Sequence, residues 1–204
     1  KKQHVDLIRI CKKLKINFLT SVFNHQDVVW LKNLNLKYIK IPSPEIHNEK
    51  LLKAVNGNFN TVIASTGTAT WNEVKKVKKI INKSKLILLH CVSAYPANAN
   101  NINLPRIEKL KKINKTVGYS GHLPGIHDAI ASLNYEPEFI EKHFTIDNNL
   151  PGRDNKFALL PKELKYLVDY KNSLLQMSIY KGKNFQKVEM DMRKHYRGRW
   201  SKKL

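Results

Sequence analysis

Short runs of apolar residues alternate along the chain with longer stretches in which apolar residues recur every three or four positions. The short runs have the length and β-branched content of strands, and the longer stretches have the period of helices that bury one face. The pattern predicts six strands, at residues 17–23, 37–41, 61–65, 86–92, 116–120 and 139–144. It predicts helices at residues 4–14, 26–34, 48–55, 70–81, 103–112, 126–133 and 162–175. Each predicted strand is therefore followed by a helix.

Two of these helices begin at residues that suit an N-terminal cap. Asn48 precedes one of them, and asparagine is among the preferred capping residues. Thr70 and Glu73 have the spacing of a capping box at the start of another. These signals support the two helix starts independently of the apolar pattern.

Strict alternation of strand and helix indicates a parallel sheet with right-handed crossovers. Two architectures satisfy this topology, an open doubly wound sheet and a closed (β/α)₈ barrel. The dinucleotide-binding form of the open sheet needs a glycine-rich loop after a strand, and no predicted strand is followed by one. The missing loop weakens the case for the open sheet.

Polar residues at the ends of the predicted strands favour the barrel. In a parallel sheet all carboxyl ends lie at one edge, and in a barrel this edge is a closed rim. The residues at or just beyond these ends are Ser21, Asn24, Lys40, Ser43, Glu45, Ser65, Thr66, His90, Ser93, Ser120, His122, Glu141 and His143. An open sheet concentrates function at one switch point, whereas here all six strands contribute. We therefore expect an α/β fold of the (β/α)₈ TIM-barrel type.

The length of the chain limits how much of a barrel it contains. A complete barrel takes about 250 residues, and this chain has 204. We expect an incomplete barrel of six βα units in residues 1–176, followed by a basic C-terminal tail in residues 177–204. Because the chain begins with Lys rather than Met, we also expect that the natural N-terminus lies upstream.

Composition excludes several classes of protein. With 42% hydrophobic and 26% charged residues, the chain is globular rather than disordered. Its longest apolar runs, such as residues 86–89, have the length of a strand and are too short for a membrane span. Two distant cysteines, Cys11 and Cys91, suit a reducing compartment. We expect a cytoplasmic protein with no membrane partner.

The net charge of the chain is strongly positive, at +21. Such a charge can attract nucleic acid, a membrane surface or an anionic substrate. Of the 37 basic residues only six are arginine, the side chain that phosphate and base-edge recognition favours. We therefore interpret most lysines as solvated helix faces and expect no nucleic-acid partner, with nucleic-acid binding as the lesser alternative. Residues 193–200 are the best candidate for a local anion contact.

Two histidines stand at the ends of successive predicted strands and could share one divalent ion. Neutral imidazole is a common metal ligand, so His122 and His143 form a candidate metal pair. A strand-end histidine is more often a hydrogen-bonded structural residue, and spacing alone does not decide between the two. Glu45 is a candidate general base, although exposed carboxylates after strands are common.

A second group of rim residues suits a small phosphorylated acid. Lys40 supplies a point charge, and Thr66, Ser93 and Ser120 supply hydroxyl donors. Taken singly, each of them is better explained as a rim residue whose hydrogen bonds are satisfied within the protein. The residue types therefore leave both interpretations open.

Six segments of the chain, in order, resemble motifs of the sialic acid synthase family. They are KIPSPEIHN at residues 40–48, STGTAT at 65–70, LLHCVSAYP at 88–96, VGYSGH at 117–122, IEKHFTID at 140–147 and PGRD at 151–154. The resemblance covers about residues 18–175. Six motifs in the family's order make it very specific.

The resemblance implies a reaction in which phosphoenolpyruvate condenses with an N-acetylmannosamine-type (hexosamine-type) aldehyde to give a sialic-acid-like nonulosonic acid. It implies a Mn²⁺ or Mg²⁺ cofactor held by His122 and His143, with Glu45 and His143 as catalytic residues. The implied substrate-binding residues are Lys40, Ser43, Thr66, Ser93, Tyr95, Ser120 and Asp154. The implied setting is surface-glycan biosynthesis by a full-length parent that forms a homodimer.

The sequence also departs from the family pattern. Gly121 replaces the aspartate usual before the metal histidine, and Leu123 replaces the threonine that follows it. The family's first two strands and its C-terminal antifreeze-like domain have no counterpart in the sequence, so we expect this chain to be inactive or feeble. The alternative is a non-catalytic barrel remnant that binds sugars or anionic ligands.

Overall fold

The computed structural model describes residues 1–201, and the chain forms two compact units. The first unit comprises residues 1–168 and contains the sheet, and the second begins at Asp169. The predicted boundary at residues 176–177 falls inside a helix that crosses this division, so the predicted domains stay a prediction. Residues 202–204 of the predicted tail lie outside the described residues.

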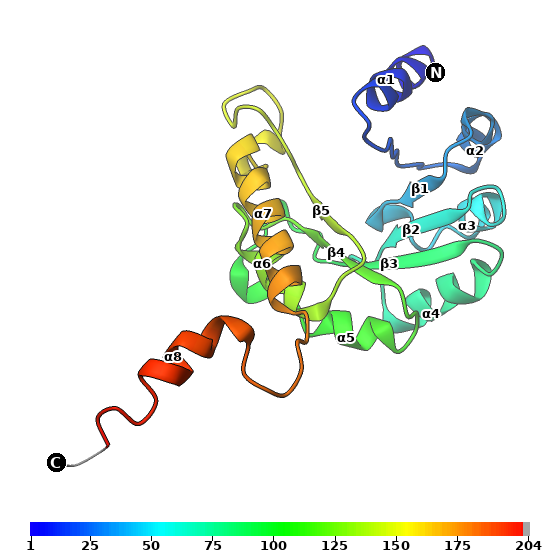
Figure 1. The fold of residues 1–204 in the computed structure, drawn as a ribbon. Coiled ribbons are helices and arrows are strands. Elements are labelled where there is room, and N and C mark those ends of the chain that lie inside the picture. Colours follow the sequence, from blue (N-terminus) through cyan, green and yellow to red (C-terminus); the bar gives the residue numbers. More distant parts are fainter. Residues whose placement is uncertain (202–204) are drawn as a thin grey trace. The chain divides into compact units, whose positions relative to one another are not determined.

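Five parallel strands form one curled sheet in the first unit (Figure 1). They are β1 (Tyr38–Ile41), β2 (Thr61–Ser65), β3 (Lys85–Cys91), β4 (Val117–Gly121) and β5 (Ile140–Lys142). Their order in the sheet is their order in the chain, and every neighbouring pair is parallel. All carboxyl ends therefore lie at one edge, which confirms the predicted fold class, an incomplete barrel of the (β/α)₈ type.

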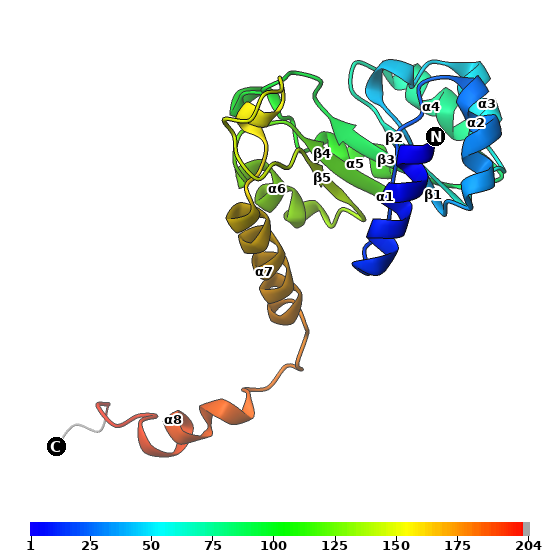
Figure 2. The ribbon, with the colours of Figure 1, turned by 90° about the horizontal axis from the view of Figure 1, so that it is seen from above.

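Helices precede, connect and follow the strands. The α-helices are α1 (Lys2–Lys13), α2 (His25–Leu31), α3 (Glu49–Val55), α4 (Trp71–Ile80), α5 (Arg106–Lys111), α6 (His127–Ser132), α7 (Pro161–Met177) and α8 (Met190–His195). Helix α5 packs against β3 and β4, and α6 packs against β4 (Figure 2). Within residues 1–201, no helix combines the length and the apolar character that crossing a membrane requires.

The two predicted helix caps are present. The Asn48 side chain accepts a hydrogen bond of 3.1 Å from the backbone N–H of Leu51, at the start of α3. At the start of α4, Thr70 and Glu73 form the reciprocal bonds of a capping box. Both caps satisfy backbone donors that the first turn of a helix cannot pair internally.

The strand predicted at residues 17–23 is wrong, and the sheet has five strands instead of six. Only an isolated bridge joins this segment to the sheet, between Ser21 and Lys40. Val22 is buried there, but Leu19 and Phe23 are exposed. A strand of a parallel sheet is stabilised by burial of both faces. Here that burial is missing, so the apolar pattern alone does not extend the ladder.

Two further predicted elements are shorter than the apolar pattern suggested. The helix predicted at 103–112 begins only at Arg106, because Asn103 has a φ of 52° and Pro105 precedes the first turn. The last strand ends at Lys142, and Phe144 instead forms an isolated bridge with Leu159. Local backbone conformation therefore sets boundaries that the apolar period does not reveal.

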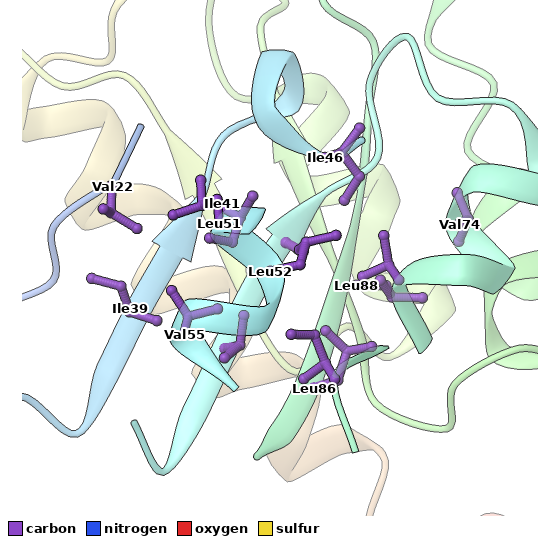
Figure 3. Packing of buried hydrophobic residues seen from close by; sticks show 14 of the residues in the cluster. Val22, Ile39, Ile41, Ile46, Leu51, Leu52, Val55, Val74, Leu86 and Leu88 are labelled. Atoms are coloured by element: carbon purple, nitrogen blue, oxygen red, sulfur yellow. The ribbon is translucent and has the colours of Figure 1, made fainter. Parts of the chain in front are cut away.

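The larger part of the core lies between the helices and the outer face of the sheet (Figure 3). Leu51, Leu52 and Val55 of α3 are almost fully buried in the same cluster as Ile39 and Ile41 of β1. Buried residues of β2, β3 and α4 continue this cluster, among them Val62, Ala64, Leu86, Leu88 and Val74. Burial of these apolar side chains is the main stabilising contribution to the unit.

The inner face of the sheet carries a smaller apolar cluster and the polar residues of interest. Ile63, Ile87 and Leu89 form that cluster, with Tyr38 and Phe139 packed against it. Successive residues of a strand point to opposite faces. The residues two positions further along these strands therefore lie on the inner face too, nearer the carboxyl ends: Lys40, Ser65, Cys91 and Glu141.

We expect Leu52→Ala to lower the free energy of unfolding by about 2–5 kcal/mol, because it leaves a cavity between α3 and the sheet. Leu52 is 1% exposed. Chemical denaturation of the whole chain would measure the change. Leu7→Ala on α1 is the matched control, since Leu7 is helical but 49% exposed, and its effect should stay within about 0.5 kcal/mol. Equal losses in the two variants would contradict the described core.

Candidate active site

An ion pair spans the inner face of the sheet from the first strand to the last. Lys40 Nζ lies 3.0 Å from Glu141 Oε1, and the Ser120 hydroxyl donates to the same oxygen at 2.7 Å. The Lys40 side chain is 8% exposed and that of Glu141 is 38% exposed. The curl of the sheet thus brings β1, β4 and β5 to one polar centre, although Lys40 and Glu141 are 101 residues apart.

A cluster of small polar side chains lies next to the end of β3. The Ser43 hydroxyl donates to Cys91 Sγ at 3.5 Å, and Sγ lies 3.7 Å from Ser93 Oγ and 3.9 Å from His122 Nδ1. A Cβ atom on Gly67 would lie 2.1 Å from Ser93 Oγ and 2.7 Å from Ser43 Oγ. Glycine at position 67 leaves the space that these two hydroxyls occupy.

Two rings lie beside the His122 ring, just after the end of β4. Its ring centre lies 4.3 Å from that of Tyr95 and 5.3 Å from that of His143, and the Tyr95 and His143 rings are 6.1 Å apart. His143 Nδ1 lies 3.7 Å from Asp154 Oδ2. The structure therefore brings together the predicted metal pair and two of the residues predicted to bind substrate, Tyr95 and Asp154.

The hydrogen bonding of His122 determines which of its nitrogens can bind a ligand. Nδ1 lies 3.0 Å from the carbonyl oxygen of Val92. A carbonyl only accepts, so Nδ1 carries the proton and Nε2 keeps its lone pair. Burial lowers the pKa of His122, and the nearby His143 lowers it further, against the raising effect of the bond to Val92. The neutral form, which is the form that binds metals, is favoured.

The two histidines are candidate ligands for a metal ion, which would take its remaining ligands from elsewhere. His122 has its Nδ1 on the Val92 carbonyl and His143 has its Nδ1 3.7 Å from Asp154 Oδ2, which makes the two Nε2 atoms the candidate ligands. Among residues 1–201, no group of three or more His, Cys, Asp or Glu side chains is arranged to hold a metal. A metal held here would therefore complete its coordination with oxygen atoms of water or substrate, as catalytic sites with open positions do.

Thr66 and Glu45 are held by neighbours of their own. The buried Thr66 hydroxyl donates to the carbonyl oxygen of Leu89 at 2.9 Å, and Arg106 Nη1 donates to the Thr66 carbonyl at 3.1 Å. The Glu45 carboxylate accepts from Asn48 at 2.7 Å. These partners differ from those of the Lys40 centre and of the histidine pair, and the predicted roles of Thr66 and Glu45 stay predictions.

Some residues of the site could not be assigned a role from the sequence. The strand pattern predicts Glu141 at the rim, but its ion pair with Lys40 has no local sequence signal. Cys91 lies at the centre of the small polar cluster, and strand alternation from Leu89 places it on the inner face. Arg106, on α5, also donates to the carbonyl of Ala69 at 3.2 Å and so holds the loop after β2. Only the structure reveals this last contact.

A curled parallel sheet with polar residues gathered at its carboxyl edge defines the (β/α)₈-barrel class, in which sites lie at this end of the strands. Residues 1–183 match the NeuB family. The chain belongs to the NeuB family, and the resemblance carried by the six motifs is confirmed.

Comparisons with individual proteins agree with this assignment. The N,N'-diacetyllegionaminic acid synthase of Campylobacter jejuni is 41% identical over 172 residues, which are 81% of this chain and 52% of that protein. The N-acetylneuraminate-9-phosphate synthase of Drosophila melanogaster is 35% identical over 173 residues, covering 82% of this chain and 46% of that protein. The chain thus spans about half the length of the curated relatives it matches.

A solved structure shows the same fold. The N-acetylneuraminic acid (sialic acid) synthetase of Leptospira borgpetersenii serovar Hardjo-bovis, crystallised in complex with citrate, matches with a TM-score of 0.85 and 33% identity. The match covers 99% of this chain and 72% of that chain. These three relatives are synthases of sialic and legionaminic acids, which are nonulosonic acids.

The buried histidines make stability depend on pH. Burial lowers the pKa of His90, and also that of His122, below the ordinary value of about 6.5. The unfolded chain therefore binds more protons than the folded chain below that value. We expect the free energy of unfolding to be largest above pH 7 and to fall steadily between pH 7 and pH 5.

Denaturation of His90→Gln across this pH range would test the expectation, because the variant should lose part of the slope. His47→Gln serves as the control, since His47 is exposed. A slope that is the same in His90→Gln and in the unmodified chain would show that His90 is not the group responsible.

Proposed function

We propose that this chain carries the catalytic face of a synthase that condenses phosphoenolpyruvate with an N-acetylmannosamine-type aldehyde. The product would be a sialic-acid-like nonulosonic acid for a surface glycan. One observation carries the proposal. The Lys40–Glu141–Ser120 centre and the His122–His143 pair lie on the same inner face of the sheet. The first supplies a cation and a hydroxyl for an anion, and the second supplies two open nitrogens for a metal ion.

The acidic substrate is assigned to the Lys40 side of the face. Phosphoenolpyruvate carries a phosphate and a carboxylate, and both accept hydrogen bonds from an ammonium group or from hydroxyls. Lys40 and Ser120 already share one carboxylate oxygen of Glu141, so they are arranged to share another anion. Ser43 and Ser93 place two more hydroxyls beside Cys91, and Thr66 stays a proposed contact at the end of β2.

The aldehyde is assigned to the aromatic side of the face. Tyr95 and Phe157 flank the histidine rings, with ring centres 6.1 Å and 5.1 Å from His143, and Asp154 lies beside it. A Mn²⁺ or Mg²⁺ ion, when bound, supplies a Lewis acid for the aldehyde oxygen. His122 and His143 would hold it, and imidazole ligands favour Mn²⁺ of the two.

The bond changes follow from the two substrates. C3 of phosphoenolpyruvate attacks the aldehyde carbon, water adds at C2, and phosphate leaves with cleavage of its C–O bond. Glu45, oriented by Asn48, is proposed to move the proton of that water. The activity of the whole protein, its cytoplasmic location and its assembly as a homodimer are parts of the same proposal.

We expect Mn²⁺ to bind the chain saturably at neutral pH, and His122→Ala and His143→Ala each to abolish this binding, because two nitrogens are the protein's contribution. Isothermal titration calorimetry with Mn²⁺ would measure it. His47→Ala is the control, since it removes an exposed histidine and should leave the titration unchanged. Binding that survives both site variants would remove the metal from the proposal.

We expect phosphoenolpyruvate to bind the Mn²⁺-loaded chain, and Lys40→Met to weaken it about tenfold or more, as expected from the loss of one charge-assisted contact. The same calorimetric titration would measure this affinity. Lys37→Met is the matched control, because Lys37 is exposed and its ammonium lies over the Tyr38 ring, 5.1 Å from its centre. Equal affinity in the Lys40 variant would contradict the assignment of the acid.

A further inference from the structure

A second ion pair lies on the outer face of the sheet, directly behind the candidate site. Lys142 Nζ donates to both carboxylate oxygens of Asp128, at 2.9 Å and 3.1 Å, and the Tyr119 hydroxyl donates to Asp128 Oδ2 at 2.9 Å. The side chains of Lys142 and Asp128 are 6% and 0% exposed. A buried ammonium needs such a partner, because an unpaired charge in the interior is strongly destabilising.

The position of this pair links it to the two histidines. Lys142 precedes His143 at the end of β5, and its ammonium also donates to the carbonyl oxygen of Leu123 at 2.6 Å. Leu123 directly follows His122. One ammonium group therefore joins the chain just after one histidine to the chain just before the other, and Asp128 from α6 neutralises it.

The Asp128 carboxylate can reach the Lys142 ammonium because residue 121 is a glycine. A Cβ atom at residue 121 would lie 2.3 Å from Asp128 Oδ2, 2.7 Å from Tyr119 Cε1 and 3.0 Å from Lys142 Cδ. The backbone does not require glycine there, because Gly121 is not among the glycines with positive φ. Glycine at 121 and the carboxylate of Asp128 are thus complementary, since the carboxylate fills the space that a side chain at 121 would need.

We propose that Asp128 is a positioning residue: from helix α6, its carboxylate holds the Lys142 ammonium in the space that a side chain at position 121 would need. Its carboxylate reaches Lys142 from seven residues further along the chain than Gly121. By holding Lys142, Asp128 fixes the ends of β4 and β5 and so the separation of His122 and His143. The effect on metal binding rests on the proposed function, whereas the effect on the two imidazoles does not.

The test compares Asp128→Ala, Gly121→Asp and the double variant Gly121→Asp/Asp128→Ala in the full chain. Asp128→Ala leaves Lys142 without its carboxylate, and Gly121→Asp forces a new side chain against Asp128 and the Tyr119 ring. Each single variant should therefore lower the denaturant concentration at which half of the chain is unfolded. Each should also shift the ¹H–¹⁵N imidazole signals of His122 and His143. The double variant returns a carboxylate to the same space, and should recover both measurements toward those of the unmodified chain.

Two further variants separate positioning from simple stabilisation. Asp128→Asn keeps the size of the side chain, so it should fold while still shifting the imidazole signals, and it should weaken Mn²⁺ binding about tenfold. Glu138→Ala is the matched control, because it breaks the exposed Lys85–Glu138 pair, whose atoms are 3.0 Å apart. It should leave both imidazoles unchanged.

The possible results are distinct. Unchanged imidazole signals in Asp128→Asn, or a double variant no better than the worse single one, would overturn the positioning role. Shifted signals that recover in the double variant, in a chain that binds no Mn²⁺ in any form, would support positioning and reject the metal in the proposed function. Recovery of both signals and Mn²⁺ affinity would support the two together.

Discussion

Strands β2 and β3 are buried on both faces, and every other strand is placed by a ladder of parallel hydrogen bonds that starts from them. A parallel ladder has one register that buries the apolar residues, because a slip of one residue would exchange the two faces. Ile63 and Leu89 therefore fix which of their neighbours face inward. The polar centre at Lys40 and the ion pair at Lys142 follow from the same register, on opposite sides of the sheet.

The repeating part of this design could be predicted from the sequence. Alternation within strands and the three-to-four period within helices are local, so the strand at 61–65 and the capped helix that begins after Thr70 could be placed correctly. The segment at 17–23 has the same local pattern but forms only a bridge to Lys40. Whether such a segment joins a sheet depends on whether another element covers it. The local pattern of apolar residues carries no information on that.

Only part of the candidate site, too, could be predicted from the sequence. Polar residues at strand ends could be predicted to share a rim, because parallel strands end together. Their pairing could not be predicted, since the contact of Lys40 with Glu141 depends on how far the sheet curls. The role of Asp128 was even harder to predict from the sequence. The sequence shows a glycine at position 121 and indicates a lost carboxylate, whereas the structure shows a carboxylate in that space from another element.

The ion pair between Lys40 and Glu141 has a consequence for any anion that binds this face. The ammonium group is already neutralised by a carboxylate of the protein, so an incoming anion must compete with that internal counterion. Its net affinity is lower than its direct contacts alone would give, because one ion pair is exchanged for another. The exchange is also reversible within the site, since Glu141 can return to Lys40 as the anion departs. An internal counterion such as Glu141 therefore favours rapid release of a charged ligand over long retention.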